Sequence, residues 1–195
     1  MACSDENIQS NGQLPQVEND KIREYIYSRS RRKQPLDIKT TFGTNLKGIK
    51  LTGVNLSGAD LSGIDFSGAE IARADFSGCN LNDVNFQGAT IQESDFSGVV
   101  FSNFTAEGAD FQASVFNKSQ FIDSDFSYCN FEEAEFTGTK IQNSKFDKAN
   151  LSKVTIQDAI IENSNFQKAN LISSVFVNAN IKNSAFFGVD MRKAK

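Results

Sequence analysis

The amino-acid sequence predicts an all-β solenoid, a chain wound into stacked, four-sided coils of 20 residues. From Leu46 to Met191 every fifth residue is Phe, Leu, Ile or Met, and Ala106 is the one exception. Between Gly68 and Gly108, glycine recurs every ten residues, always two positions after a member of this five-residue series. A fixed period of this kind decides the architecture of a repeat protein before any local pattern does.

A period of five fits neither a helix nor a strand. Five residues advance an α-helix by about 500°, so an apolar stripe would precess by about 140° per unit. On a strand, an odd period sends successive large side chains to opposite faces. The chain therefore has to turn once per unit, so that every large side chain points toward one common axis.

The glycine pattern sets the number of units per coil. Glycine at every second unit requires an even number, and four units remain because two cannot enclose a core and six would leave a hole. Glycine at alternate corners also predicts two turn types, of which one has the positive φ that glycine adopts at low cost.

The inward positions alternate between large and small side chains. The position two residues before each large residue is mostly Ala, Ser or Val, so Cys79 and Cys129, which occupy it, are expected to be small core residues. At one unit Phe104 takes the small position and Ala106 the large one, which predicts a local bulge. Large residues 20 apart are expected to stack, and one aromatic column would contain Phe66, Phe86, Phe126, Phe146, Phe166 and Phe186.

The segment before the repeat divides into two parts. Residues 1–16 are polar and aperiodic, which predicts a disordered tail. Residues 17–34 carry Ile22, Tyr25 and Ile26 at helical spacing and are followed by Pro35, which predicts a capping helix. We expect its apolar stripe to cover the open end of a solenoid at 35–195. The cations at the end of this helix, Arg29, Arg31, Arg32 and Lys33, suit the helix dipole, with a nucleic-acid patch as the alternative.

Composition argues against most catalytic chemistry. The sequence contains no histidine, the commonest general base and metal ligand, and its cysteines form no CxxC pair. We therefore expect no catalytic residues, no metal and no cofactor. The sequence has neither a secretory signal pattern nor a membrane-length apolar run, which predicts a cytoplasmic protein without membrane contact, with delivery into another cell as the alternative.

Units such as Ala59-Asp60-Leu61, Ala109-Asp110-Phe111 and Ala149-Asn150-Leu151 give the chain a family resemblance. It resembles the pentapeptide repeat proteins, whose units follow the pattern A(D/N)LXX. The resemblance implies a right-handed quadrilateral β-helix of about 7.5 coils. It also implies a possible function, because some members are similar to duplex DNA in size and charge and bind type II topoisomerases.

Charge is unevenly distributed along the repeat. Residues 54–137 contain fourteen acidic side chains against Arg73 and Lys118, whereas residues 138–195 contain four against nine basic ones. An acidic body of this kind attracts a basic partner. The candidate partner-binding residues, here called the acidic belt, are Glu70, Asp75, Asp95, Asp110, Glu132, Glu133 and Glu135.

Two functions remain open at this point. The first is a non-enzymatic scaffold that binds a protein partner of unknown identity, without direct contact to nucleic acid. The alternative is a DNA-mimicking modulator of a type II topoisomerase, which protects or inhibits DNA gyrase. Against the alternative, the acidic residues are spread over four faces, and the array lacks the loop insertions of several gyrase-protecting family members.

The last coils predict a site of self-association. An exposed sheet edge promotes association unless it is covered. Large apolar residues accompany that edge, and we expect a C-terminal homodimer through Ile172, Val175, Val177, Phe187 and Met191.

Overall fold

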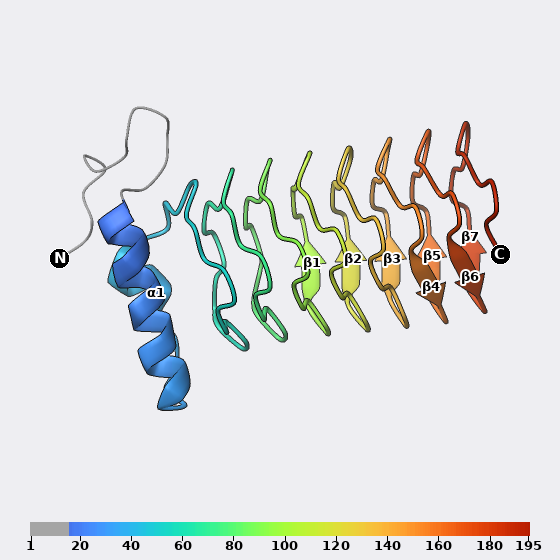
Figure 1. Cartoon of the computed structure of the whole chain (residues 1–195). Coiled ribbons are helices and arrows are strands. Elements are labelled where there is room, and N and C mark those ends of the chain that lie inside the picture. The colour runs from blue at the N-terminus through green and yellow to red at the C-terminus, as the bar shows by residue number, and fades with distance from the viewer. Residues whose placement is uncertain (1–15) are drawn as a thin grey trace.

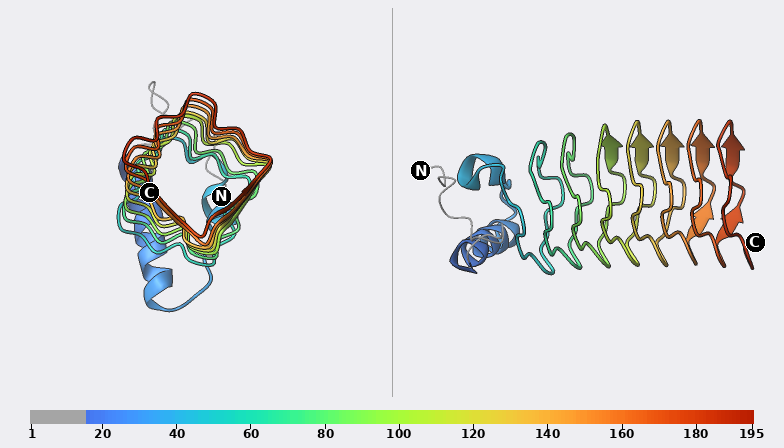
Figure 2. Two further views of the ribbon diagram at one scale, coloured as in Figure 1. Left: turned by 90° about the vertical axis from the view of Figure 1, so that its right-hand side faces the viewer. Right: turned by 90° about the horizontal axis from the view of Figure 1, so that it is seen from above.

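The computed structural model describes residues 16–195, which form a stack of coils with helices at its N-terminal end (Figure 1). Helix α1 spans Gln16–Arg31, helix α2 spans Ile38–Phe42, and the coils follow. Viewed along the stack, the coils have a four-sided outline (Figure 2). The predicted tail, apart from Gln16, lies outside the described residues.

Backbone pairing fixes the coil at 20 residues. Parallel bridges join residues 20 apart along the whole array, from Asn45–Asp65 to Asn170–Asp190. One side of the stack forms a five-stranded parallel sheet of β1 (Val100–Ser102), β2 (Gln120–Ile122), β3 (Lys140–Gln142), β5 (Ile160–Glu162) and β7 (Asn180–Lys182). A second side pairs β4 (Thr155–Gln157) with β6 (Val175–Val177). The predicted solenoid is confirmed, while its right-handed sense and its number of coils stay predictions.

The core is a set of aromatic columns along the axis. Phe66 stacks on Phe86 with ring centroids 5.3 Å apart, and Phe146 stacks on Phe166 at 4.9 Å. Phe104 bridges the unit where the column lacks a large residue, because its ring lies 5.7 Å from Phe86 and 5.4 Å from Phe126. The exchange with Ala106 therefore keeps the column continuous.

The predicted bulge at this unit is wrong. Thr105, between Phe104 and Ala106, bridges Asn85 on one side and Asp125 on the other, so the 20-residue register continues without an extra residue. The side chains exchange size without displacing the backbone, because Phe104 and Ala106 both point into the same interior space and both are fully buried.

The corners differ from the prediction in their backbone conformation. The residue two positions after each large residue has positive φ at every corner from Gly48 to Lys193, including Asp83 at 58° and Asn143 at 50°. Glycine therefore does not mark a separate turn type. Asn and Asp tolerate this region better than other residues that have a side chain, whereas lysine enters it here because the coil requires it.

The corners have two hydrogen-bonded forms, and a buried serine in the following coil marks many corners of the second form. In the closed form the N–H of Ala59 donates to the carbonyl of Leu56 at 3.0 Å, as in a β-turn. In the open form the N–H instead donates to a serine hydroxyl one coil further on. Examples are Ser124 N–H to Ser144 Oγ at 3.2 Å and Ser144 N–H to Ser164 Oγ at 3.1 Å.

Helix α1 lies across the N-terminal end of the stack. Ile22 and Ile26, one turn apart, are buried in the common core. Asn19 Oδ1 accepts a 2.9 Å hydrogen bond from the N–H of Lys50 in the first coil.

Helix α2 was not predicted, since the solenoid was expected from residue 35. Asp37 caps it by accepting from the N–H of Thr40, and the first bridge of the solenoid follows at Asn45.

Candidate partner-binding surfaces

Lysines neutralise the acidic residues at both ends of the acidic body. On the N-terminal side Asp60 pairs with Lys39 at 2.6 Å, and Lys47 and Lys50 pair with Asp65 and Glu70. The Lys39 ammonium, as a hydrogen-bond donor, lowers the pKa of the Asp60 carboxyl to about 2. The acidic residues of the first coils are therefore compensated within the chain.

The same happens on the C-terminal side. Lys145 lies 3.5 Å from Asp125, one coil away in the register. Lys153 lies 2.9 Å from Glu132 and 2.8 Å from Glu133. Hydrogen bonds to these two carboxylates raise the pKa of Lys153, which keeps it charged across the physiological range.

A further set of carboxylates from Asp75 to Glu135, interspersed in the sequence with the ion-paired Asp125, Glu132 and Glu133, makes no ion pair within the described part of the chain. We call this set the middle band, and its members are Asp75, Asp83, Glu93, Asp95, Glu107, Asp110, Asp123 and Glu135. Their charges are not neutralised by the molecule itself, so they are available to a partner.

Neutral donors hold several of these carboxylates in place. Asp75 accepts from the backbone N–H of Ser77 at 2.9 Å and from its hydroxyl at 2.6 Å. Asp110 accepts from Gln92 at 2.6 Å and from Asn130 at 2.9 Å. Hydrogen bonds of this kind orient a carboxylate and leave its negative charge uncompensated. The band is thus a set of oriented charges on a repeating backbone.

The predicted acidic belt overlaps the middle band in part. Asp75, Asp95, Asp110 and Glu135 belong to both, whereas Glu70, Glu132 and Glu133 are ion-paired. Sequence reasoning left out Asp83, Glu93, Glu107 and Asp123. The ion-paired acids could have been recognised in part from the spacing of the lysines, because Lys50, Lys145 and Lys153 each stand 20 residues from an acidic residue with which they pair.

The strands of one side of the stack contain no residue of the band, which reaches this side only at its corner, through Asp83 and Asp123. Asp75, Asp95 and Glu135 lie in one row of bridged residues, with Val115 between the last two. The outward side of the five-stranded sheet contains none of the band. It presents Val100, Gln120, Lys140 and Ile160 instead.

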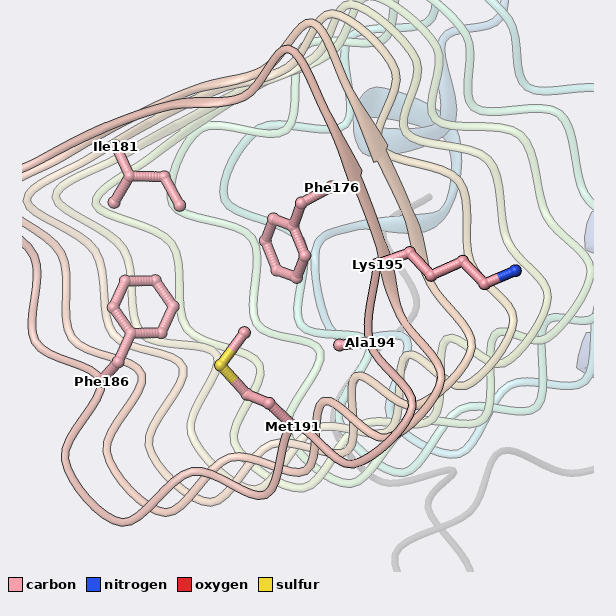
Figure 3. A pocket seen from close by; sticks show the side chains of 6 residues that line it. All are labelled: Phe176, Ile181, Phe186, Met191, Ala194 and Lys195. Carbon is pink, nitrogen blue, oxygen red and sulfur yellow. The ribbon is translucent and has the colours of Figure 1, made fainter.

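A second candidate surface is the C-terminal end of the stack. The last coil surrounds an apolar hollow of about 530 Å³, which faces along the axis (Figure 3). Phe176, Ile181, Phe186, Met191, Ala194 and Lys195 line it. The large residues among them are the inward-facing residues of the last described coil.

The predicted self-association residues are only partly at this hollow. Met191 lines it, whereas Phe187 is 77% exposed and is not among the lining residues. Ile172 and Val175 are half-buried, and Val177 is exposed. Apart from Met191, the predicted residues are at outward positions, so the prediction left out Phe176, Ile181 and Phe186, which are inward positions uncovered at the end of the array.

The described residues offer no site for metal or thiol chemistry. They contain no cluster of three or more His, Cys, Asp or Glu side chains placed to hold a metal ion. Burial raises the pKa of the Cys79 thiol to about 12, and that of Cys129 further. Both thiols donate to backbone carbonyls of the core, as small core residues do. Within the same residues, no helix has the length and apolar character needed to cross a membrane.

Fold and surface together define a class of protein: a repeat solenoid with regular charged sides and an apolar end. The chain belongs to the pentapeptide repeat family. The pentapeptide repeats model matches residues 44–83, 64–103 and 158–192, and the pentapeptide repeat region model matches residues 89–166. The recognition made from the five-residue units is thereby confirmed.

Comparison with the curated proteins gives no match. Solved structures with a similar fold include HetL, a protein involved in heterocyst differentiation regulation from the cyanobacterium Nostoc sp. strain PCC 7120. It is 17% identical over 78% of this chain and 86% of that one, with a TM-score of 0.42. Trypsin-treated QnrB1, a plasmid-mediated fluoroquinolone resistance protein, is 20% identical over 83% and 87%, with a TM-score of 0.48. Rfr23 from the cyanobacterium Cyanothece 51142 is 14% identical over 80% and 93%, with a TM-score of 0.31.

Proposed function

We propose that this protein is a cytoplasmic, non-enzymatic scaffold that binds the basic surface of a protein partner through the middle band. The observation that carries the proposal is the pattern of ion pairs. Lysines pair with Asp60 and Glu70 before the band and with Asp125 and Glu133 near its C-terminal end, whereas the carboxylates of the band have no ion-pair partner within residues 16–195.

The geometry of the band favours binding with little reorganisation. Asp75 and Asp95 lie one coil apart in one row, at a spacing of about 4.8 Å, and Glu135 lies two coils further along the same row. Their donors already orient them, so a partner does not have to order them on binding. A set of like charges also attracts an oppositely charged surface from a distance and accelerates association at low salt.

Charge reversal with a matched control tests this proposal. The test variant carries Asp75→Lys, Asp95→Lys and Glu135→Lys, and the control variant carries Asp147→Lys, Asp158→Lys and Glu162→Lys, with the same change in net charge. The intact chain, the test variant and the control are each cross-linked to partners and the captured proteins are quantified. We expect the test variant alone to lose a specific partner. Equal capture by all three chains would refute binding through the band.

A second candidate is the DNA-mimicking modulator of a type II topoisomerase, and the charge density of the band favours it. With the ion-paired acids set aside, eight carboxylates and Lys118 remain between residues 75 and 135. This segment spans three coils, about 14 Å at the usual strand spacing. It therefore carries one net charge per about 2 Å, close to the value of about 1.7 Å for duplex DNA.

A supercoiling assay with purified gyrase separates the two candidates. DNA mimicry predicts that the chain inhibits supercoiling or protects the enzyme at stoichiometric excess, that added duplex DNA relieves the effect, and that the test variant lacks it. No effect of the wild-type chain at a tenfold excess would eliminate this candidate and leave the scaffold.

A further inference from the structure

The two ends of the stack differ in their hydrogen-bonding groups. In each side of a coil, two N–H groups donate to the following coil and one donates to the preceding coil. For example, the N–H groups of Phe166 and Lys168 donate to the carbonyls of Ala185 and Phe187, and the N–H of Ala185 donates back to Ser164. By this pattern the C-terminal end presents two N–H donors for each carbonyl acceptor. It is therefore an electropositive backbone edge.

Side chains around the C-terminal end add to this positive potential. Lys182, Arg192, Lys193 and Lys195 are exposed in the last coil. Asp190 is the acidic residue of that coil, and the Arg192 guanidinium holds it at 2.7 Å. The rim of the hollow thus has a surplus of cations that no carboxylate of the described chain neutralises.

The N-terminal end shows how this fold covers an open coil. Helix α1 places Ile22 and Ile26, one turn apart, on the core, and both are almost fully buried. Asn19 on the same helix supplies an oxygen acceptor to the edge N–H of Lys50. Ile38 of α2 is buried in the same core, and Tyr25, Leu36 and Phe42 pack against it. An amphipathic helix therefore closes a coil of this size together with a few apolar residues beside it.

We propose that the C-terminal end binds an amphipathic helix of a protein partner, with two large apolar side chains in the hollow and carboxylates against the rim. The hollow has the volume for such side chains and is lined almost entirely by apolar residues. Acidic flanks match both the surplus of backbone donors and the unpaired lysines. This inference rests on the proposed scaffold function but concerns a surface separate from the middle band.

A second copy of the chain fits this surface less well. Two C-terminal ends that meet would oppose donor-rich edges and bring their lysines together, which is unfavourable. Head-to-tail stacking is also blocked, because α1 already covers the N-terminal end (Figure 1). The homodimer predicted from the sequence is therefore the competing outcome of the test.

The probe is a helix-stabilised, fluorescent 16-residue peptide with two isoleucines four positions apart and glutamates on both flanks. One control peptide replaces the isoleucines by serine, and another replaces the glutamates by lysine. Binding to the full chain is measured by fluorescence anisotropy at about 50 mM and 300 mM salt, since charge contacts at a surface weaken as salt rises. We expect saturable binding of the probe and at least tenfold weaker binding of both controls.

Variants of the chain locate the site. Met191→Asp places a charge in the hollow, and we expect at least a tenfold loss of peptide affinity. Phe187→Asp is the matched control, because Phe187 is more exposed than Met191 and lies outside the hollow. Circular dichroism checks that both variants keep the fold. The middle-band reversal should leave peptide binding unchanged, so the two proposals fail independently.

Three results would overturn the inference. The first is no binding of the acidic peptide at 1 mM, and the second is equal binding of the acidic and basic peptides. The third is a dimer of the wild-type chain in sedimentation at tens of micromolar that Met191→Asp dissociates, which would assign the end to self-association instead.

Discussion

Exchanging Phe104 and Ala106 tests whether the two residues share one interior space. Phe104→Ala removes a ring that contacts Phe86, Phe101 and Phe126, with centroids 4.9–5.7 Å away. Ala106 beside it cannot fill the cavity. We expect a loss of about 3–5 kcal/mol in the free energy of unfolding, the range for a buried phenylalanine.

The partner substitution acts in the opposite direction. Ala106→Phe alone adds a ring to a fully packed interior and should cost about 1–3 kcal/mol through overpacking. The double variant restores the arrangement of the other units, with a small residue two positions before a large one. Because volume is conserved, it should cost less than about 1.5 kcal/mol.

The assay is equilibrium unfolding in guanidinium chloride, followed by far-UV circular dichroism. The three variants and the wild type form a double-mutant cycle, whose coupling energy should be favourable by several kcal/mol. Equal slopes of the unfolding transitions are needed for the comparison, because coils of a solenoid can unfold separately. A double variant as unstable as the sum of the single variants would refute the shared-space argument.

Three further predictions concern the corners, the cap and the thiols. Ser144→Ala removes the acceptor of the Ser124 N–H at an open corner. Because a buried donor then loses its partner, we expect a loss of about 1–3 kcal/mol in the free energy of unfolding, measured by chemical unfolding. An unchanged unfolding midpoint would show that the corner closes instead. The Asp60 pKa is lowered from 3.8 to about 2, so the contribution of the Lys39–Asp60 pair to stability is complete above the ordinary carboxyl pKa and declines as pH falls through about 2. Lys39→Met should flatten this acid limb in thermal unfolding scans between pH 5 and 2, and an identical limb in both chains would contradict the assignment. Cys79 and Cys129 should resist iodoacetamide at pH 8 in the folded chain and react on unfolding, because burial raises the pKa of both thiols. Mass spectrometry measures the modification. Rapid labelling of either thiol in the native state would show that the core opens.

The architecture could be predicted from the sequence because one residue in five carries the pattern. Leu46 to Met191 fixed the inward side of every unit, and the 20-residue coil followed. The backbone conformation of the corners could not be predicted in the same way. Lys148 and Lys153 adopt positive φ as Gly68 does, because the closed coil imposes the conformation and the core compensates for its cost. Buried serines, which distinguish the open corners, look like any other small residue in the sequence.

The candidate surfaces were predictable to a smaller extent. The excess of acid in residues 54–137 is visible in the sequence, but which carboxylates keep their charge depends on the register that brings Lys50 to Glu70 and Lys145 to Asp125. Helix α2 escaped prediction because five residues carry too little periodicity to recognise. The hollow at the C-terminal end is formed by inward positions, of which only Met191 was predicted from the sequence as a contact residue.

The constant 20-residue register has a consequence for the distance between the two surfaces. The middle band and the C-terminal hollow belong to one continuous stack, so the distance between them changes only by whole coils, in steps of about 4.8 Å. Adding 20 residues would move the two surfaces apart by one coil, and removing 20 would bring them closer by one coil, without a rotation of one surface relative to the other about the stack axis. A partner that contacts both would therefore select chain lengths, and related chains of other lengths would present the same two surfaces at different, discrete separations.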